Sequence, residues 1–170
     1  MEKTLHIINK MHKQGLFKKY AIGGGIATLF YIEPFATFDL DILIILKKES
    51  ESLISLSPLY QWLKRRGYKS IKEQIVIEGI PVQFIPAYNE LVKEAVLHSI
   101  KKKYKTESTF VLRPEYLLAI MVQTNRPKDR DRMLKLIEET EISNTLLEKI
   151  LNKYNLKNNY MKFKEKFYGS

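Results

Sequence analysis

The chain has 170 residues, of which 45% are hydrophobic and 28% charged, and its formal net charge is +10. This composition is typical of a soluble globular protein, and no apolar run approaches the roughly 18 residues that span a bilayer. With no cysteine and three scattered histidines, disulfides are excluded and a histidine-rich metal site is disfavoured. The N-terminal segment lacks the continuous apolar region of a secretory signal, so we expect one cytoplasmic domain over residues 1–170.

The first two thirds of the chain alternate predicted helices and strands. Hydrophobic spacing and punctuation by glycine, proline and asparagine predict the following order. The elements are a helix over 2–14, a strand over 18–24, a brief helix over 25–33, a central strand over 39–46, a helix over 51–66 broken near Pro58, hairpin strands over 73–79 and 81–86, an Asn89-capped helix to about Ile100, and a strand over 108–112.

The remainder of the chain is predicted to be helical. Helices are expected over 114–124 and 127–139, each with proline in its first turn, and over 144–154. This order predicts an α/β (α+β) fold, with a mixed core over 1–112, C-terminal helices over 113–154 and a basic aromatic tail over 155–170. Tyr160, Phe163, Phe167 and Tyr168 recur near helical spacing in the tail, which favours docking on the domain or on a second subunit over base stacking.

The surplus of positive charge has two interpretations. A polyanionic partner such as RNA is one, because neutralised phosphates supply most of the non-specific affinity for nucleic acid. A generally lysine-rich composition is the other. The cations gather at Lys101–Lys103, at Arg126–Arg132 and in the tail, which favours the first interpretation slightly.

Asp39 and Asp41 stand at the start of the apolar strand predicted over 39–46. Residues two apart on a strand project from the same face, so the two carboxylates are expected to point the same way. Such a pair suits a hard divalent cation, and we expect Mg²⁺ or Mn²⁺ there. The alternative is a solvated strand start, where aspartate is a common turn residue.

Gly23, Gly24 and Gly25 join the preceding strand to a helix. Bare N–H groups at such a turn can hold phosphate, although a turn that merely needs positive φ also favours glycine. Phosphate-binding and metal-binding elements therefore lie next to each other along the chain.

Two segments carry a resemblance to a known family. "GGG…TFDLDI" resembles the signature of the nucleotidyltransferase superfamily, a glycine pair followed by a helix and an Asp-x-Asp strand. "PEYLLAIMVQTNRPKDRDRMLKL" resembles the second conserved block of AbiEii-like, toxin-type minimal nucleotidyltransferases, and "EGIPVQFIPAYNELVKEAV" is similar to uncharacterised members of that group. The resemblance covers about residues 18–138 and implies a nucleotidyltransferase-like mixed sheet flanked by helices.

The resemblance also implies roles for individual residues. Gly24 and Gly25 would lie at the triphosphate, Asp39 and Asp41 at the metal, and Thr37 beside them. The further matches in the downstream block are Arg126, Lys128 and Asp129. In toxin members a basic residue or a carboxylate of this block completes the site, so the resemblance implies catalytic roles for Lys128 and Asp129 and nucleotide binding by Arg126.

Three positions depart from the pattern of the family. Gln83 stands where many members have a third carboxylate, and an amide is no general base although it can orient a bound water. Met121 replaces a lysine and Phe35 an arginine of related proteins. Asp129 can supply the third charge, although acids in a first helical turn, such as Asp129 and Asp131, also complement the helix dipole.

The leading hypothesis is an enzyme that transfers a nucleoside monophosphate from an NTP to an acceptor hydroxyl. The expected acceptor is RNA, first of all tRNA, or else a protein, as in toxins that have an antitoxin partner. The alternative is a catalytically degenerate protein of the same fold that binds RNA or a protein. No membrane association is expected, and the chain is predicted to be a monomer or a homodimer.

Overall fold

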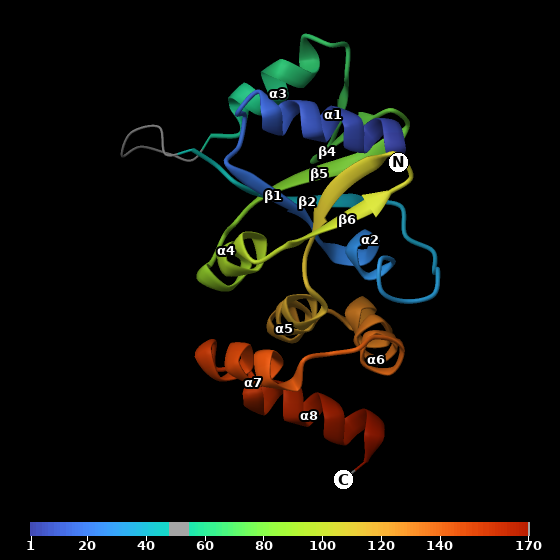
Figure 1. Ribbon diagram of the computed structural model, residues 1–170, viewed down its shortest axis with the longest axis vertical. Coiled ribbons are helices and arrows are strands. Elements are labelled where there is room, and N and C mark those ends of the chain that lie inside the picture. Colours follow the sequence, from blue (N-terminus) through green and yellow to red (C-terminus); the bar gives the residue numbers. More distant parts are fainter. Residues whose placement is uncertain (48–54, 170) are drawn as a thin grey trace.

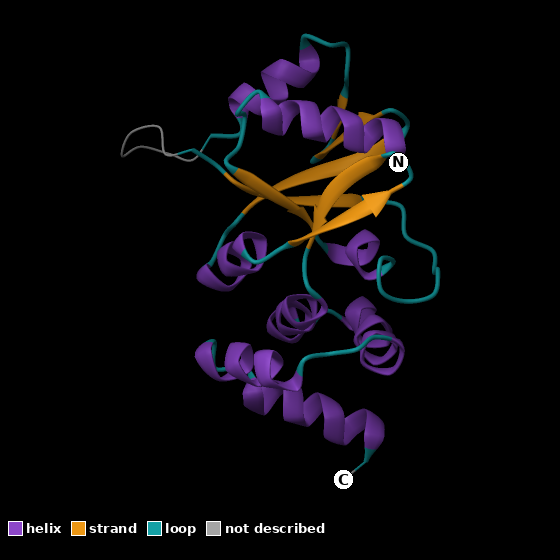
Figure 2. Ribbon diagram, in the orientation of Figure 1, coloured by secondary structure: helices purple, strands orange, loops and turns teal. Residues whose placement is uncertain are grey.

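The computed structural model describes residues 1–47 and 55–169. It contains one mixed β-sheet with helices on both faces, and a stack of further helices below it (Figures 1 and 2). The helices are α1 (Glu2–Lys13), α2 (Gly24–Thr28), α3 (Ser57–Lys64), α4 (Glu90–Leu97), α5 (Pro114–Thr124), α6 (Arg130–Glu139), α7 (Asn144–Lys153) and α8 (Lys157–Tyr168), and a 3₁₀ turn, η1, covers Pro127–Asp129. The strands are β1 (Lys19–Ile22), β2 (Leu40–Ile45), β3 (Ser70–Ile71), β4 (Gln74–Ile77), β5 (Ile80–Pro86), β6 (Ile100–Tyr104) and β7 (Glu107–Val111).

The seven strands lie in the order β3-β4-β5-β2-β1-β7-β6. Strand β2 is central: it runs antiparallel to β1 and parallel to β5. The expected hairpin around Glu78 and Gly79 is confirmed, since β4 and β5 pair antiparallel and both turn residues have positive φ. The expected α+β class with a mixed sheet is confirmed as well.

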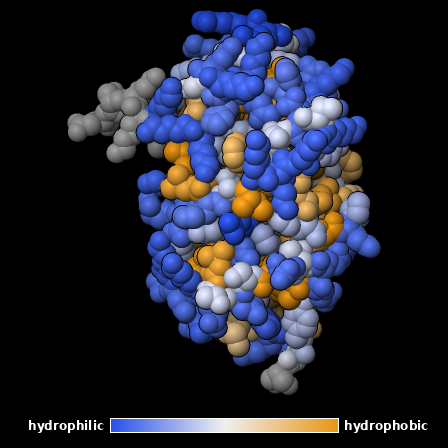
Figure 3. Space-filling view, viewed as in Figure 1, coloured by the Kyte–Doolittle hydropathy of each residue, from blue (hydrophilic) through white to orange (hydrophobic). Residues whose placement is uncertain are grey.

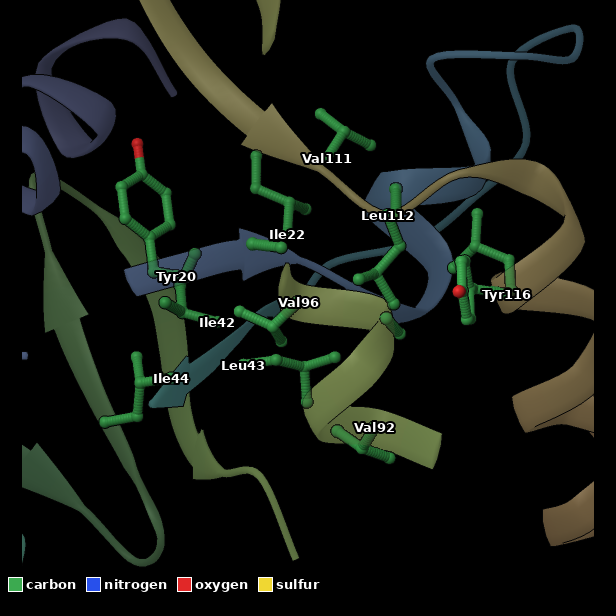
Figure 4. Packing of buried hydrophobic residues seen from close by; sticks show 14 of the residues in the cluster. Tyr20, Ile22, Ile42, Leu43, Ile44, Val92, Val96, Val111, Leu112 and Tyr116 are labelled. Atoms are coloured by element: carbon green, nitrogen blue, oxygen red, sulfur yellow. The ribbon is translucent and has the colours of Figure 1, made fainter. Parts of the chain in front are cut away.

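The alternating side chains of β2 serve two layers of the core. Ile42 and Ile44 are fully buried, and Leu43 between them is 6% exposed. Figure 4 shows Leu43 between β2 and α4, beside Val92 and Val96. Helices α1 and α3 lie on one side of the sheet, and α2 and α4 on the other (Figure 1). Because both faces are covered, the apolar sequence of β2 is that of a buried central strand.

The C-terminal half stacks helices α5 to α8 beneath α2 and α4 (Figure 1). Helix α5 is almost wholly buried, and α6, α7 and α8 all contact it. Residues 157–168 of the predicted tail form α8, and Tyr160 and Phe163 pack against the core. Docking of the tail on the domain, as its helical spacing predicted, is therefore observed at these two aromatics.

The end of one predicted helix differs from the structure, and an edge strand that the sequence analysis did not predict follows it. The helix capped by Asn89 ends at Leu97, because Ile100–Tyr104 forms the edge strand β6. In β6, Ile100, Lys102 and Tyr104 are half-buried while Lys101 and Lys103 are exposed, an alternation that three successive lysines conceal in the sequence. Exposed lysines on an edge strand also discourage pairing with another chain.

Two further helices are shorter than predicted. The helix expected over 25–33 ends at Thr28, where Thr28 Oγ1 donates to the carbonyl of Gly24. The helix expected over 51–66 is α3 from Ser57, as the break at Pro58 predicted, and its first residues, 51–54, lie outside the described part of the chain.

The face shown in Figure 3 is covered mostly by hydrophilic residues, with hydrophobic residues in small patches between them. Within residues 1–47 and 55–169, none of the helices combines the length and apolar character needed to cross a membrane.

Candidate active site

The turn between β1 and α2 holds the carboxylate of Asp41 in contact with a glycine. The N–H of Gly23 donates to the carbonyl oxygen of Asp41 at 2.9 Å, which joins the turn to the start of β2. Gly24 has φ +57, and a Cβ built on it would overlap Oδ2 of Asp41. Only glycine satisfies both requirements, because it tolerates positive φ and leaves room for the carboxylate.

Gly25 brings two more polar groups to the same turn. A Cβ built there would lie 2.6 Å from Oγ1 of Thr37 and 3.0 Å from Nη2 of Arg132. Thr37 comes from the loop before β2, and Arg132 from the first turns of α6. Segments far apart in the sequence therefore meet at the glycine turn.

Asp39 and Asp41 differ in their surroundings. Asp39 precedes the first residue of β2 and is exposed, whereas Asp41 lies on the strand and is half-buried. Burial raises the pKa of Asp41; the positive charge of Arg126 lowers it, and the neighbouring charge of Asp39 raises it further. Lys128 and Arg132 also lower this pKa. Asp41 is thus a carboxylate whose ionised form burial disfavours, with several cations nearby that offset the effect only in part.

Asp129 is fully buried and is paired with two arginines. Its carboxylate accepts hydrogen bonds from Nε of Arg126 at 2.6 Å and from Nη1 of Arg132 at 3.1 Å. The guanidinium of Arg132 also lies 5.2 Å from the centre of the Phe35 ring. Both oxygens of Asp129 are therefore engaged, and the carboxylate orients the two guanidiniums.

The local sequence explains how this ion-pair cluster forms. Helix α5 ends at Thr124, and the next residue, Asn125, caps it in the left-handed conformation with φ 48. Pro127 opens η1, and α6 continues from Arg130. Asp129 lies three residues after Arg126, which precedes η1 in an extended conformation. It lies three residues before Arg132, a spacing at which side chains meet on one helical face.

Gln83 and Lys128 complete the surroundings of Asp41. Gln83 is the partner of Asp41 in the parallel pairing of β2 with β5, so both side chains leave the same face of the sheet. Lys128 is exposed on η1 and acts electrostatically on Asp41, whereas Asp131 on α6 is exposed. The structure thus brings together most of the residues that the sequence singled out: Gly23, Gly24, Gly25, Thr37, Asp39, Asp41, Gln83, Arg126, Lys128 and Asp129.

Arg132 is the site residue that sequence reasoning missed. It contacts the glycine turn, Asp129 and Phe35. The available signal was its spacing, three residues beyond Asp129 on a predicted helix. Phe35 was noted only for the arginine it replaces; here its ring lies against an arginine that comes from another element.

The donors at the β2 end of the site fit a magnesium ion. Within the described residues, no group of three or more acidic or histidine side chains gathers to bind a metal. Mg²⁺ is commonly held by one or two carboxylates together with water and substrate phosphates. Asp39 and Asp41 are the two carboxylates at this end of β2. A cation there would also counter the cost of burying the ionised Asp41.

Comparison with known proteins bears on the fold. No family model matches the chain, and no curated protein matches it. Among solved structures, an antigenic nucleotidyltransferase-like protein from Paracoccidioides brasiliensis is similar, with a TM-score of 0.69 and 14% sequence identity. The match covers 96% of this chain and 86% of that chain. At this identity the likeness concerns the fold alone: the chain has a nucleotidyltransferase-like α+β fold.

Proposed function

We propose that this protein is a magnesium- or manganese-dependent nucleotidyltransferase that transfers a nucleoside monophosphate from an NTP to an acceptor hydroxyl. One observation carries the proposal. The half-buried carboxylate of Asp41 lies directly against the glycine turn, and the positive charges of Arg126, Lys128 and Arg132 act on it and lower its pKa. A half-buried acid that feels several positive charges, next to a bare backbone turn, suits a metal-bound triphosphate, which carries charges of both signs.

Asp39 and Asp41 would hold the metal, and Gly24 and Gly25 leave the backbone open at the place where phosphates would lie. A bound divalent cation supplies Lewis-acid polarisation of the phosphates. The first N–H groups of α2 have no partner within the helix, and they can donate to phosphate oxygens. Thr37, in contact distance of the Gly25 position, offers a hydroxyl to the same group.

Arg126 and Arg132 would neutralise the charge that develops on the transferred and leaving phosphates, with Lys128 as a further point charge. Asp129 would act on both arginines as a positioning residue, because each of its oxygens already accepts a hydrogen bond from one of them. This role replaces the direct catalytic role that the sequence resemblance implied for Asp129.

In the proposed reaction, the acceptor oxygen forms a bond to the α-phosphorus and the bond from that phosphorus to the β-bridging oxygen breaks. Pyrophosphate leaves with the bond's electrons. Gln83, beside Asp41, can hydrogen-bond the acceptor but cannot remove its proton. The proton therefore passes to water or to one of the two aspartates.

The test is incubation of the full chain with Mg²⁺, each labelled NTP in turn and total tRNA, with total protein as a second acceptor. Wild type is expected to label an acceptor with at least one NTP. Asp41→Asn should reduce the rate about 10²–10³-fold or more, since it removes a charged ligand of the metal that would stabilise the reacting phosphates. Labelling by Asp41→Asn at the wild-type rate would defeat the proposal.

The rival function is a catalytically silent protein of the same fold that binds RNA or a protein. Gln83 favours it, because this amide lies beside Asp41 in the strand pairing and supplies no third charge. The rival predicts that wild type and Asp41→Asn bind RNA equally and that neither transfers label from any NTP.

The AbiEii-like subtype, and with it the role of a toxin with an antitoxin partner, is the finer prediction that rests on the resemblance of residues 114–136. Induced expression of the wild-type chain in bacteria should arrest growth, whereas Asp41→Asn should not. Equal growth of both strains would set the toxin role aside without touching the transfer reaction.

A further inference from the structure

A cavity of about 340 Å³ lies between the end of α5, the start of α6 and helix α8. Its lining includes the cations Arg130, Lys162 and Lys166 and the aromatic rings of Phe163 and Phe167. Its volume is within the range of small-molecule and cofactor sites. The cavity is separate from the glycine turn, and the roles proposed above use none of these side chains.

The charge in this cavity has one sign. No acidic residue is among the described residues that line it, and none of its three cations forms an ion pair within the described chain. Lys162 and Lys166 are exposed one turn apart on α8, and Arg130 on α6 is half-buried. An anionic ligand would therefore meet cations from two elements without displacing an internal partner.

Aromatic rings lie beside these cations. The rings of Phe163 and Phe167 are 5.0 Å apart, and Phe167 is 38% exposed. Nζ of Lys166 lies 5.7 Å from the centre of the Phe167 ring. Accessible rings next to cations are the combination by which proteins hold single-stranded nucleic acid, with bases on rings and phosphates on cations.

The cavity adjoins the candidate active site through one turn. Asn125 lines the cavity, while the next residue, Arg126, pairs with Asp129 at the site. Arg130 likewise lines the cavity, while Arg132 contacts Asp129 and the glycine turn. A nucleic-acid strand bound in the cavity would thus lie beside the segment 126–132, which carries the cations of the candidate active site.

We propose that this cavity binds a single-stranded segment of the acceptor RNA. That the bound RNA is the acceptor rests on the proposed function. That RNA binds in this cavity is inferred from the residues that line it. Single-stranded RNA is favoured over a duplex because only an unstacked base can reach the ring of Phe167. It is favoured over an acidic peptide because a peptide of aspartate and glutamate has no planar ring for Phe167 to meet. The net charge of +10 favours a polyanion in general.

The test measures binding of a fluorescein-labelled single-stranded RNA 12-mer to the full chain by anisotropy over a range of salt concentrations. The double variant Lys162→Gln/Lys166→Gln should bind about tenfold or more weakly. Its slope of log affinity against log salt should fall by about 1.4, because two phosphates lose a cation each. Lys164→Gln is the matched control: Lys164 lies on the same helix, is exposed, and is not among the cavity's lining residues.

The aromatic contribution has its own variant. Phe167→Leu keeps an apolar side chain but removes the ring, and it should weaken RNA binding about fivefold or more with the salt slope unchanged. As a control, each variant should unfold thermally at the same midpoint temperature as wild type, which would show that its fold is retained. A poly-glutamate peptide that binds as tightly as the RNA, together with wild-type affinity in Phe167→Leu, would assign the cavity to an acidic protein and overturn the proposal.

Failure of this proposal is distinguishable from failure of the proposed function. If the lysine double variant keeps wild-type affinity for RNA, the cavity proposal is wrong, whatever the transfer assay gives. If the wild-type chain transfers no label, but the double variant binds RNA more weakly than wild type, the cavity proposal stands and the transfer reaction fails.

Discussion

Asp129 and Asp41 come from different halves of the molecule, and the charges of the same two arginines act on both carboxylates. They differ in the hydrogen bonds and ion pairs that their carboxylates form. Asp129, in the helical half, is fully buried and accepts hydrogen bonds from Arg126 and Arg132. Asp41, on the central strand, is half-buried, and within the described chain its carboxylate forms no ion pair. The first carboxylate has its partners within the protein, and the second is the one that we propose binds a ligand. The difference separates a carboxylate that builds the site from one that is available to bind in it.

The largest expected effect on stability is that of replacing Asp129, the carboxylate with two arginine partners. Asp129→Asn leaves two guanidiniums without their charge partner, and we expect the free energy of unfolding to fall by about 3 kcal/mol. Urea denaturation measures this loss, and Asp131→Asn, at an exposed acid two residues away, is the control that should change little. Equal stabilities for the two variants would show that the buried pairing of Asp129 contributes nothing.

The next effect tests the close approach of Asp41 to the glycine turn. Gly24→Ala strains a residue with φ +57 and pushes against the Asp41 carboxylate, whereas Gly67→Ala strains a residue with φ +85 that has open space around it. We expect Gly24→Ala to lose roughly 1–3 kcal/mol more than Gly67→Ala in the free energy of unfolding. The difference between the variants, measured by chemical denaturation, isolates the clash from the backbone strain. If both lose the same amount, Asp41 does not lie against the turn.

Glu94 supplies a second satisfied carboxylate for the comparison, at the junction of α4, α5 and α7. Burial would raise its pKa, but hydrogen bonds from Lys153, Tyr154 and Tyr116 lower it to about 2. A depressed pKa means that the ionised form stabilises the fold above the unfolded value of 4.5, and that this contribution is lost as the pH falls towards 2.

Glu94→Gln should therefore lower the free energy of unfolding by about 1 kcal/mol at pH 7. The difference from wild type should shrink below pH 4.5, the unfolded value. Urea denaturation at a series of pH values measures it. A difference that is the same at pH 7 and at pH 3 would mean that the charge of Glu94 does not cause it.

The smallest expected effect has the opposite sign and belongs to Asp41. Burial raises the pKa of Asp41 in the folded state above the unfolded value of 3.8. The protonated carboxyl therefore stabilises the fold fully below pH 3.8, and this contribution is lost as the pH rises through the folded pKa. At pH 7 Asp41→Asn should therefore be more stable than wild type by about 0.5 kcal/mol, a gain typical of variants that give up a functional residue. The gain should vanish near pH 3 in thermal unfolding. A loss of stability at pH 7 would mean that the protein already satisfies Asp41.

Local chemistry made much of this molecule predictable. Proline, glycine and asparagine mark the true ends of several elements, as at Pro114 and at the Asn89 cap, whose side chain accepts from the N–H of Val92. Asp39, Asp41 and the glycines were proposed as site residues because their spacing suits phosphate and metal binding and because their order resembles the family signature.

What escaped prediction depends on contacts between distant segments. Arg132 reaches the glycine turn only because of the way α6 packs near α2, which no local pattern encodes. The strand β6 was hidden because lysine stands on both of its faces. The cavity beside Phe167 exists because α8 lies under α5 and α6, and spacing in the tail indicated docking without indicating a place.

The central claim is that Asp41 is a carboxylate held ready for a metal-bound triphosphate. Calorimetric titration of each NTP into the wild-type chain, with Mg²⁺ and then with EDTA, tests it most directly, with Asp41→Asn and Asp131→Asn as the matched pair. We expect binding that requires Mg²⁺, persists in Asp131→Asn and is lost in Asp41→Asn. Binding of every NTP that is equal with and without Mg²⁺, or undiminished in Asp41→Asn, would contradict the account.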